Sequence, residues 1–264
     1  MSDFYNLHRG EAPLLISIPH LGTDIPSPMK HVYSEVALTV ADTDWHLDRL
    51  YDFAKAMGAT LLSAQLSRYV IDLNRPANDE SLYPGQTTTG LCPTETFRGE
   101  AIYRRGLEPC QAERQRRVAT YWQPYHTTLR AELTRLREKH PNVLLWEAHS
   151  IASNLPRLFD GKLPDLNLGT QMGRTAHALV QSAAERAAAE SAYMWITNGR
   201  FQGGYITRQY GDPERGIHAV QLEMCQSTYM NEDPPFLYWD ARAAAVQPTL
   251  QRMVGGALNA VECL

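Results

Sequence analysis

The chain has 264 residues, of which 44% are hydrophobic and 20% charged, so it holds enough apolar material for a folded core. Its 25 basic and 29 acidic residues give a formal net charge of −4 without a basic stripe, which argues against a nucleic-acid partner. No apolar run approaches the ~20 residues that a membrane span needs, and the first residues do not resemble a secretory signal.

The first predicted elements alternate between strand and helix. The apolar run 13–20 predicts a strand that ends in Pro-His, and residues 42–59 have the apolar spacing of a helix closed by Gly58. Residues 60–76 predict one or two strands with a polar end. The Pro-, Gly- and Thr-containing segment 77–97 predicts an irregular loop.

The central part of the chain predicts one long element. Residues 99–139 are dense in charge and indicate a helix with a solvent-exposed face, interrupted or kinked near Pro109 and Pro124.

The remaining segments continue the alternation. Residues 142–150 predict a buried strand, 169–191 an Ala-rich helix, and 216–224 a strand that ends in an acid. We find no repeat, low-complexity tract or linker in the sequence. The order therefore predicts a single domain over residues 1–264, of the α/β class, with helices covering both faces of a sheet.

The four cysteines stand far apart and form no C-x-x-C pair. They indicate free thiols, not a disulfide framework or an evident metal site, and free thiols are typical of a reducing compartment. We therefore expect a cytoplasmic protein. The cysteines are Cys92, Cys110, Cys225 and Cys263.

Polar residues follow the apolar part of four predicted strands. They are His20, Asn74 with Arg75, His149 with Ser150, and Glu223. Ligands of open α/β sheets bind beyond the carboxyl ends of the strands. Four separated pieces of sequence are therefore predicted to converge on one site.

Two histidines of this set, His20 and His149, supply half of a zinc site. Catalytic zinc usually takes three protein ligands and leaves one position for water. Taken alone, His20 fits a histidine in a surface turn, and His149 a hydrogen-bonded core histidine, better than a metal ligand. The richest source of a third ligand is residues 42–48, which contain Asp42, Asp44, His46 and Asp48.

Three further residue types suit hydrolysis of an acidic substrate. Glu223 is a candidate base, because water that attacks a carbonyl needs a proton acceptor, although a capping or ion-paired acid is the alternative. Arg68, Asn74 and Arg75 are candidates for anion binding, since arginine pairs with carboxylates through its planar fork. The alternative is ion pairing with Asp72 or Asp79, and Asp72 would explain one of the two arginines but not both.

Eight stretches between residues 16 and 224, in a consistent order, together resemble the N-formylglutamate amidohydrolase (deformylase) family. They are SIPHLGTDIP, ADTDWHLDRLY, SRYVIDLNRP, GLCPTETFRGEAIY, LLWEAHSI, DLNLGT, NGRFQGGYITRQYG and HAVQLEM. This family is similar to zinc carboxypeptidases and aspartoacylases. The resemblance implies a zinc-carboxypeptidase-like fold, with a mixed, mostly parallel eight-stranded sheet between helices.

The same resemblance implies a set of metal ligands. His20 and His149 would bind one divalent ion, zinc. In the relatives an acid three residues after the first histidine completes the set, but Thr23 stands there in this chain. The resemblance assigns the acidic ligand to Asp44, with Asp24 as the alternative.

The resemblance also implies roles around the metal. Arg68 would polarise the scissile carbonyl, Asn74 and Arg75 would clamp a substrate carboxylate, and Glu223 would be the general base. The reaction would convert N-formyl-L-glutamate to formate and L-glutamate, a step of bacterial histidine degradation. The substrate's second carboxylate requires another cation, for which the candidates are Arg98, Arg200 and Arg208.

Two other functions fit the same residues. A zinc amidase or peptidase for another N-acyl amino acid or a cell-wall peptide would share every catalytic group and differ only in its anchors. A non-catalytic binding protein would not need Glu223 to face a metal. A small-molecule substrate without a membrane or nucleic-acid partner is expected for the enzyme, and the sequence leaves the oligomeric state open.

Overall fold

The structure is a computed structural model that describes residues 4–82, 85 and 88–264. The strands of this part of the chain form one sheet in the order β1-β3-β2-β4-β7-β5-β6, with four parallel and two antiparallel pairings. The predicted mixed, mostly parallel α/β sheet is confirmed, with seven described strands where the resemblance implied eight. In this order they are β1 (Tyr5–His8), β3 (Thr60–Ala64), β2 (Leu14–Ile18), β4 (Val143–Ile151), β7 (Ile217–Cys225), β5 (Leu166–Gly169) and β6 (Trp195–Thr197).

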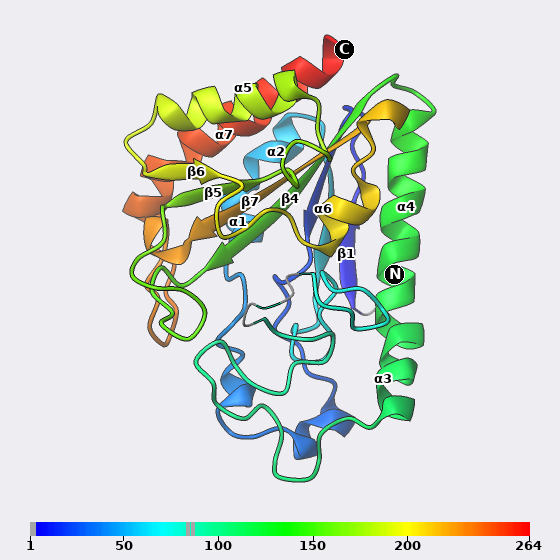
Figure 1. Cartoon of the computed structure of the whole chain (residues 1–264), viewed down its shortest axis with the longest axis vertical. Coiled ribbons are helices and arrows are strands. Elements are labelled where there is room, and N and C mark those ends of the chain that lie inside the picture. Colours follow the sequence, from blue (N-terminus) through cyan, green and yellow to red (C-terminus); the bar gives the residue numbers. More distant parts are fainter. Residues whose placement is uncertain (1–3, 83–84, 86–87) are drawn as a thin grey trace.

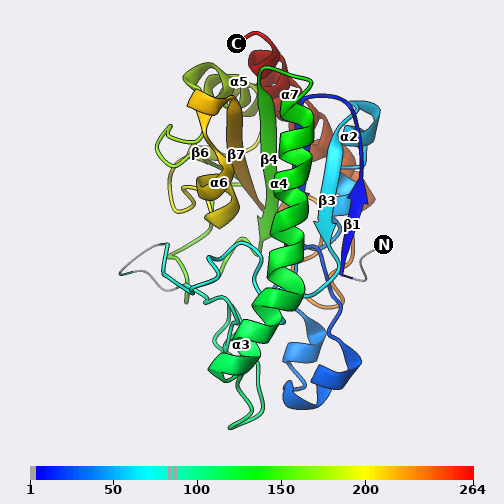
Figure 2. The ribbon, with the colours of Figure 1, turned by 90° about the vertical axis from the view of Figure 1, so that its right-hand side faces the viewer.

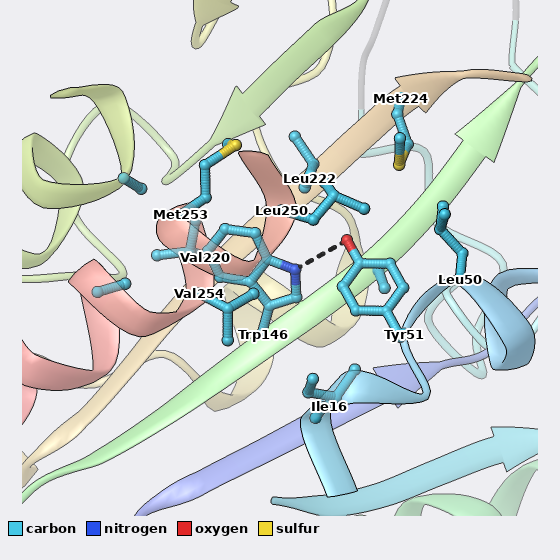
Figure 3. Close-up of a cluster of buried hydrophobic side chains, with 14 of the residues drawn as sticks. Ile16, Leu50, Tyr51, Trp146, Val220, Leu222, Met224, Leu250, Met253 and Val254 are labelled. Carbon is cyan, nitrogen blue, oxygen red and sulfur yellow. Dashed lines mark hydrogen bonds between the residues drawn. The ribbon is translucent and has the colours of Figure 1, made fainter. Parts of the chain in front are cut away.

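One face of the sheet is covered by four helices (Figure 1). Trp146 of β4 is fully buried there, and its indole Nε1 donates a hydrogen bond of 3.2 Å to the hydroxyl of Tyr51 (Figure 3). Because burial of such large apolar surfaces drives folding, this layer is the main core. Its helices are α1 (Leu47–Leu50), α2 (Phe53–Ala56), α5 (Ala178–Ala189) and α7 (Asp240–Glu262).

The other face packs against a long helical segment, which Figure 2 shows in front of the sheet and running roughly along its strands. It consists of α3 (Gln111–Arg117), the π-helical turn η3 (Val118–Trp122) and α4 (Gln123–Arg137). The short α6 (Tyr205–Tyr210) also packs on this face, beside β4 and β7. The remaining short helices are η1 (Ser27–Val32), η2 (Ala37–Thr39), η4 (Pro213–Arg215) and η5 (Gln226–Thr228).

The alternation of strand residues places the polar groups on one face. Leu145 packs on the α4 side of the sheet, and successive strand residues point to opposite faces, so Glu147 and His149 follow on the same side. Gln221 and Glu223 do the same on β7, which pairs in parallel with β4. These polar residues therefore meet near the carboxyl ends of the two strands.

Irregular chain lies beyond those strand ends. Residues 19–46 and 65–110 contain no strand and only short 3₁₀ helices among their described positions. Figure 1 shows them, in blue and in cyan to green, gathered below the sheet. These two irregular segments cover the polar ends of β2, β4 and β7, and we call them the roof.

The predicted strands that lead to the site are confirmed. Residues 13–20, 142–150 and 216–224 correspond to β2, β4 and β7. The prediction for 60–76 is correct only for β3, because the chain leaves the sheet after Ala64 and forms turns and isolated bridges. The loop predicted for 77–97 has neither helix nor strand where it is described, and residues 83–84 and 86–87 lie outside the described part.

The helix predicted over 42–59 is wrong for its first half. Only the two single turns α1 and α2 form, because His46 adopts a left-handed φ of 60° and the backbone N–H of Asp44 donates to the carbonyl of His20. Gly58, with φ of 74°, ends the segment as predicted.

The two later helices begin further along the chain than predicted. The helix expected over 99–139 begins at Gln111, and Gly99 and Gly106, at positive φ, belong to the irregular segment before it. The π-helical turn lies just before Pro124, which has no N–H to donate to the preceding turn. The helix expected over 169–191 begins at Ala178, because residues 171–173 all have positive φ.

The sequence did not predict strands β1, β5 and β6 or helices α6 and α7. Strands β5 and β6 have only 4 and 3 residues, too few to show a periodicity. Helix α7 contains Pro248 and two adjacent glycines, which are signals against a helix. No helix in the described part of the chain is long and apolar enough to cross a membrane, and the four cysteines are unpaired as predicted.

His126 of α4 anchors the segment that precedes the site. Its Nε2 lies 2.9 Å from the carbonyl oxygen of Leu73, and its Nδ1 lies 2.9 Å from the hydroxyl of Tyr210. The ring is buried and stacks on Trp122, with 3.8 Å between the ring centroids. Burial lowers the pKa of His126 to about 4, so the folded protein holds this ring neutral.

We expect His126 to make the protein less stable in mild acid. The unfolded chain binds a proton at this side chain below its ordinary pKa of about 6.5, whereas the folded chain does so only below about 4. Stability should therefore fall as the pH drops from 6.5 to 4, by roughly 3 kcal/mol from this group. Urea unfolding at several pH values should show a shallower fall for His126→Gln.

Comparison of the native chain with His126→Gln isolates the contribution of this one side chain to the acid sensitivity. His218 also has its pKa lowered to about 4 by burial and therefore adds to the acid sensitivity of both proteins equally. Parallel stability profiles for the native chain and His126→Gln would contradict the assignment.

Candidate active site

A cavity of about 80 Å³ lies at the carboxyl ends of β2, β4 and β7, on the side of α4 and α6. Residues from four separate stretches of the sequence meet there, as predicted. The predicted site residues that line it are His20, Arg68, Asn74, Arg75, His149, Arg200 and Glu223.

Three buried side chains in this region form a group that could hold a metal ion. His20, Asp44 and His149 each offer one ligand atom, and these atoms all lie within 4.8 Å of one another. The Oδ2 atom of Asp44 is 2.9 Å from Nδ1 of His149 and 3.7 Å from Nδ1 of His20. Two imidazoles and one carboxylate are a donor set that catalytic zinc sites use.

The hydrogen bonds of the two imidazoles fit a metal. Nε2 of His20 lies 2.6 Å from Asp72 Oδ1, and Nε2 of His149 lies 2.8 Å from Glu147 Oε1. Each carboxylate can accept the proton of its Nε2, which leaves the Nδ1 lone pairs facing Asp44. Nδ1 of His20 is buried and has no hydrogen-bond partner among the described residues. Since buried polar atoms are nearly always paired, this atom fits a metal ligand.

Arg68 lies among the acids of the cluster. Nη2 of Arg68 donates a 2.7 Å hydrogen bond to Asp72 Oδ2, and Nη1 lies 4.0 Å from Asp44 Oδ1. Burial alone would raise the pKa of Asp72, but His20 and Arg68 hold it well below its usual range. Burial alone would likewise raise the pKa of Asp44, but the imidazoles of His149 and His20 beside it hold that pKa well below its usual range. Both carboxylates are therefore negatively charged near neutral pH.

Glu223 lies directly across from His149 in the β4–β7 pairing. It is buried and lines the cavity, and its burial raises its pKa to about 8, although His149 counteracts part of that rise. A carboxyl group with a pKa near the working pH can both accept and return a proton. The position and the pKa of Glu223 suit a general base.

Comparison with known proteins identifies the family. A family model described as N-formylglutamate amidohydrolase matches residues 12–230, most of the chain. The chain belongs to this family. An N-formylglutamate deformylase from Pseudomonas putida is 48% identical over 255 residues, which cover 96% of this chain and 95% of the relative. One from Pseudomonas aeruginosa is 47% identical and covers 96% of both chains.

Solved structures of two proteins share the fold. The crystal structure of an N-formylglutamate amidohydrolase from Ralstonia eutropha JMP134 matches with a TM-score of 0.81 at 25% identity, over 98% of both chains. A protein from Agrobacterium tumefaciens matches with a TM-score of 0.74 over 98% of this chain and 96% of its own length. Its identity of 18% supports the fold alone.

In this N-formylglutamate amidohydrolase family member, Asn74 is engaged with the protein itself. Its Oδ1 accepts a 2.8 Å hydrogen bond from the backbone N–H of Ile206, and its Nδ2 lies 3.0 Å from Nε2 of His149. A Cβ atom at Gly204 would lie 2.2 Å from Asn74 Nδ2, so only glycine allows this approach. Through its bond to Ile206, Asn74 therefore holds the start of α6 beside the histidine.

The arginines predicted to bind substrate are not equally placed. Arg75 and Arg200 line the cavity, and the Nε of Arg75 donates to the carbonyl of Thr89 at 2.8 Å. Arg98 lines an adjoining cavity instead, and Arg208 donates to backbone carbonyls, including that of Gly203. This placement favours Arg75 and Arg200 as substrate anchors.

The alternative acidic ligand lies elsewhere. Asp24 is exposed, forms an isolated β-bridge with Leu66 and lines a different cavity. Of the acids considered from the sequence, only Asp44 lies in the group with the two histidines.

Sequence reasoning missed two acids that orient the histidines. Asp72 was considered only as an ion-pair partner, and Glu147 was given no role. Glu147 Oε2 accepts a hydrogen bond from the backbone N–H of Thr207 at 2.9 Å and another from its hydroxyl. The signal was present, because residues two apart on a strand share a face, and Glu147 stands two before His149.

We expect Glu147→Gln to weaken metal binding by about 10- to 100-fold. A glutamine that keeps the bonds to Thr207 turns an amide N–H toward His149 Nε2, which moves the ring proton to Nδ1, the atom that faces Asp44. Competition between the protein and a chelator for Zn²⁺ measures this change without reference to activity.

Glu132→Gln is the matched control for Glu147→Gln. Glu132 of α4 is also a buried acid, but it pairs with Arg9 near the N-terminus and with Arg135 of the same helix. Glu132→Gln should therefore leave the affinity for Zn²⁺ unchanged. Equal affinities of the native chain and Glu147→Gln would show that this acid does not orient His149.

Proposed function

We propose that the protein is a zinc-dependent hydrolase that cleaves N-formyl-L-glutamate to formate and L-glutamate. The observation that carries this proposal is the group of His20, Asp44 and His149 beside Glu223, at a small cavity that Arg75 and Arg200 also line. The relatives that are 48% and 47% identical over nearly the whole chain are N-formylglutamate deformylases. A role in histidine degradation and a cytoplasmic location remain predictions.

The metal would be held by His20, Asp44 and His149. When bound there, a divalent ion supplies Lewis-acid polarisation of the formyl oxygen and makes water a better nucleophile at neutral pH. Asp72 and Glu147 hold the two rings with their Nδ1 atoms toward that position.

Glu223 would move the proton. Burial and its place opposite His149 put its carboxyl group at the cavity that must hold the formyl carbon. As the water attacks, Glu223 takes its proton, and it then returns the proton to the nitrogen of the departing glutamate. General acid–base catalysis of this kind contributes about 10²–10⁴ in rate.

Arg68 would stabilise the negative charge that develops on the formyl oxygen. Its guanidinium lines the cavity and is fixed by Asp72 through the 2.7 Å hydrogen bond. A donor that is already oriented needs no rearrangement during the reaction, which is the condition for effective electrostatic stabilisation.

The two carboxylates of the substrate would be bound by two arginines. The guanidinium of Arg75 is oriented by the carbonyl oxygens of Thr89 and Asn74, at 2.8 and 3.1 Å, and suits the α-carboxylate. Arg200 on the loop before α6 also lines the cavity and suits the side-chain carboxylate. A hydrolase of another N-acyl amino acid would share the metal and the base but would lack a use for Arg200.

We expect strong selectivity for N-formylglutamate over N-formylglutamine. The amide removes one negative charge and leaves the second arginine without its anion, and sites built to pair a polar group discriminate by roughly 10⁴ or more. Steady-state kinetics of the zinc-loaded enzyme on both substrates should show this difference in kcat/KM. Arg200→Ala should reduce the preference by lowering kcat/KM for formylglutamate alone.

Glu223→Gln is the control for a substitution that slows the chemical step but does not change the preference between the two substrates. It should lower kcat for both substrates by about 10²–10⁴ and leave their ratio unchanged. Equal kcat/KM for formylglutamate and formylglutamine in the native enzyme would indicate a broader N-acyl amidase.

A further inference from the structure

A second cavity adjoins the candidate active site. It measures about 230 Å³, against about 80 Å³ for the first, and both cavities are lined by Phe97, Ser150 and Ile151. These three residues therefore form a shared wall. The second cavity lies between this wall and the segments that carry Ala152 and Leu155.

The ring of Phe97 is held firmly in this wall. Its backbone N–H donates to Asp42 Oδ2 at 2.8 Å, and the guanidinium carbon of Arg68 lies 4.7 Å from the ring centroid. The side chain is 9% exposed and packs in an apolar cluster with Ile151 and Leu155. Such a ring has little freedom to move aside for a substrate.

The polarity of the first cavity indicates how a substrate lies in it. Arg75 and Arg200 attract the carboxylates of an N-acylglutamate, whereas Phe97 and Ile151 offer no polar side-chain atom. In the proposed function, Arg68 contacts the oxygen of the scissile carbonyl. Phe97 lies against that guanidinium. A carbonyl bound to Arg68 would therefore carry its substituent on the side of the shared wall.

We propose that Phe97 determines the size of the acyl group and restricts the enzyme to N-formyl substrates. The formyl carbon carries only a hydrogen on that side, which the small cavity accommodates. A propionyl or butyryl chain would collide with the ring, and the second cavity is the space that such a chain would occupy if the ring were absent. This inference rests on the proposed function, since it takes the position of the carbonyl from Arg68.

The test is an acyl-length series in the zinc-loaded enzyme. Initial rates on N-formyl-, N-acetyl-, N-propionyl- and N-butyryl-L-glutamate give kcat/KM for the native chain and for Phe97→Ala. The native enzyme should lose activity steeply beyond formyl. In Phe97→Ala the propionyl-to-formyl ratio should rise by about tenfold or more, since space for a few methylene groups is worth roughly this much.

Two variants distinguish the removal of the Phe97 ring from a general loosening of the active site. Phe201→Ala removes a ring that lines the first cavity but not the second, and it should not raise the ratio. Ala152→Leu fills the second cavity, and in combination with Phe97→Ala it should reverse the gain. If Phe97→Ala does not fold, Phe97→Leu retains an apolar side chain in the cluster and should give a smaller gain of the same sign.

The outcomes distinguish this inference from the function on which it rests. A propionyl-to-formyl ratio that stays at the native value in folded Phe97 variants, while N-formylglutamate is still cleaved, would overturn the role of Phe97 alone. A native enzyme that cleaves none of the four substrates would overturn the proposed function and this inference with it.

Discussion

The structure depends on how charged carboxylates are accommodated in a buried cluster. Asp44, Asp72 and Glu147 are all withdrawn from water at the ends of β2 and β4, with Arg68 as the permanently charged side chain that bonds one of them. An unpaired buried charge is costly, so such a cluster needs further positive charge or protons. Two imidazoles whose Nδ1 atoms converge on Asp44 meet this need if they share a divalent ion, and Glu223 then lies beside the reacting groups.

The fold positions this cluster with few elements. The parallel register of β4 and β7 sets His149 opposite Glu223, and Glu147 connects the same histidine to Thr207 of α6. In the roof segment, Asp72 connects His20 to Arg68. Glu147 therefore links the metal position to α6, and Asp72 links it to Arg68, the proposed oxyanion donor. A change in either acid should be felt at several groups at once.

The sequence predicted the residues at strand ends but not the segments between them. Periodicity identified β2, β4 and β7, and their polar ends correctly predicted that His20, His149 and Glu223 meet. It failed where long-range contacts override local preference. Residues 42–46 have helical spacing, yet Asp44 leaves the helix to bond the backbone of His20 and reach the histidines. Sequence spacing also could not show which of the other predicted arginines face the cavity. Their placement depends on the three-dimensional path of the roof and of the loop before α6. These arginines are Arg75, Arg98, Arg200 and Arg208.

Titration of the metal-stripped protein with Zn²⁺ tests the central claim most directly. The account predicts one ion bound per chain, and loss of that binding in His149→Ala with retention of the fold by circular dichroism. His177→Ala, which changes an exposed histidine at the start of α5, should bind Zn²⁺ like the native chain. Absence of stoichiometric binding, or unchanged affinity in His149→Ala, would contradict the assignment of His20, Asp44 and His149 as the metal site.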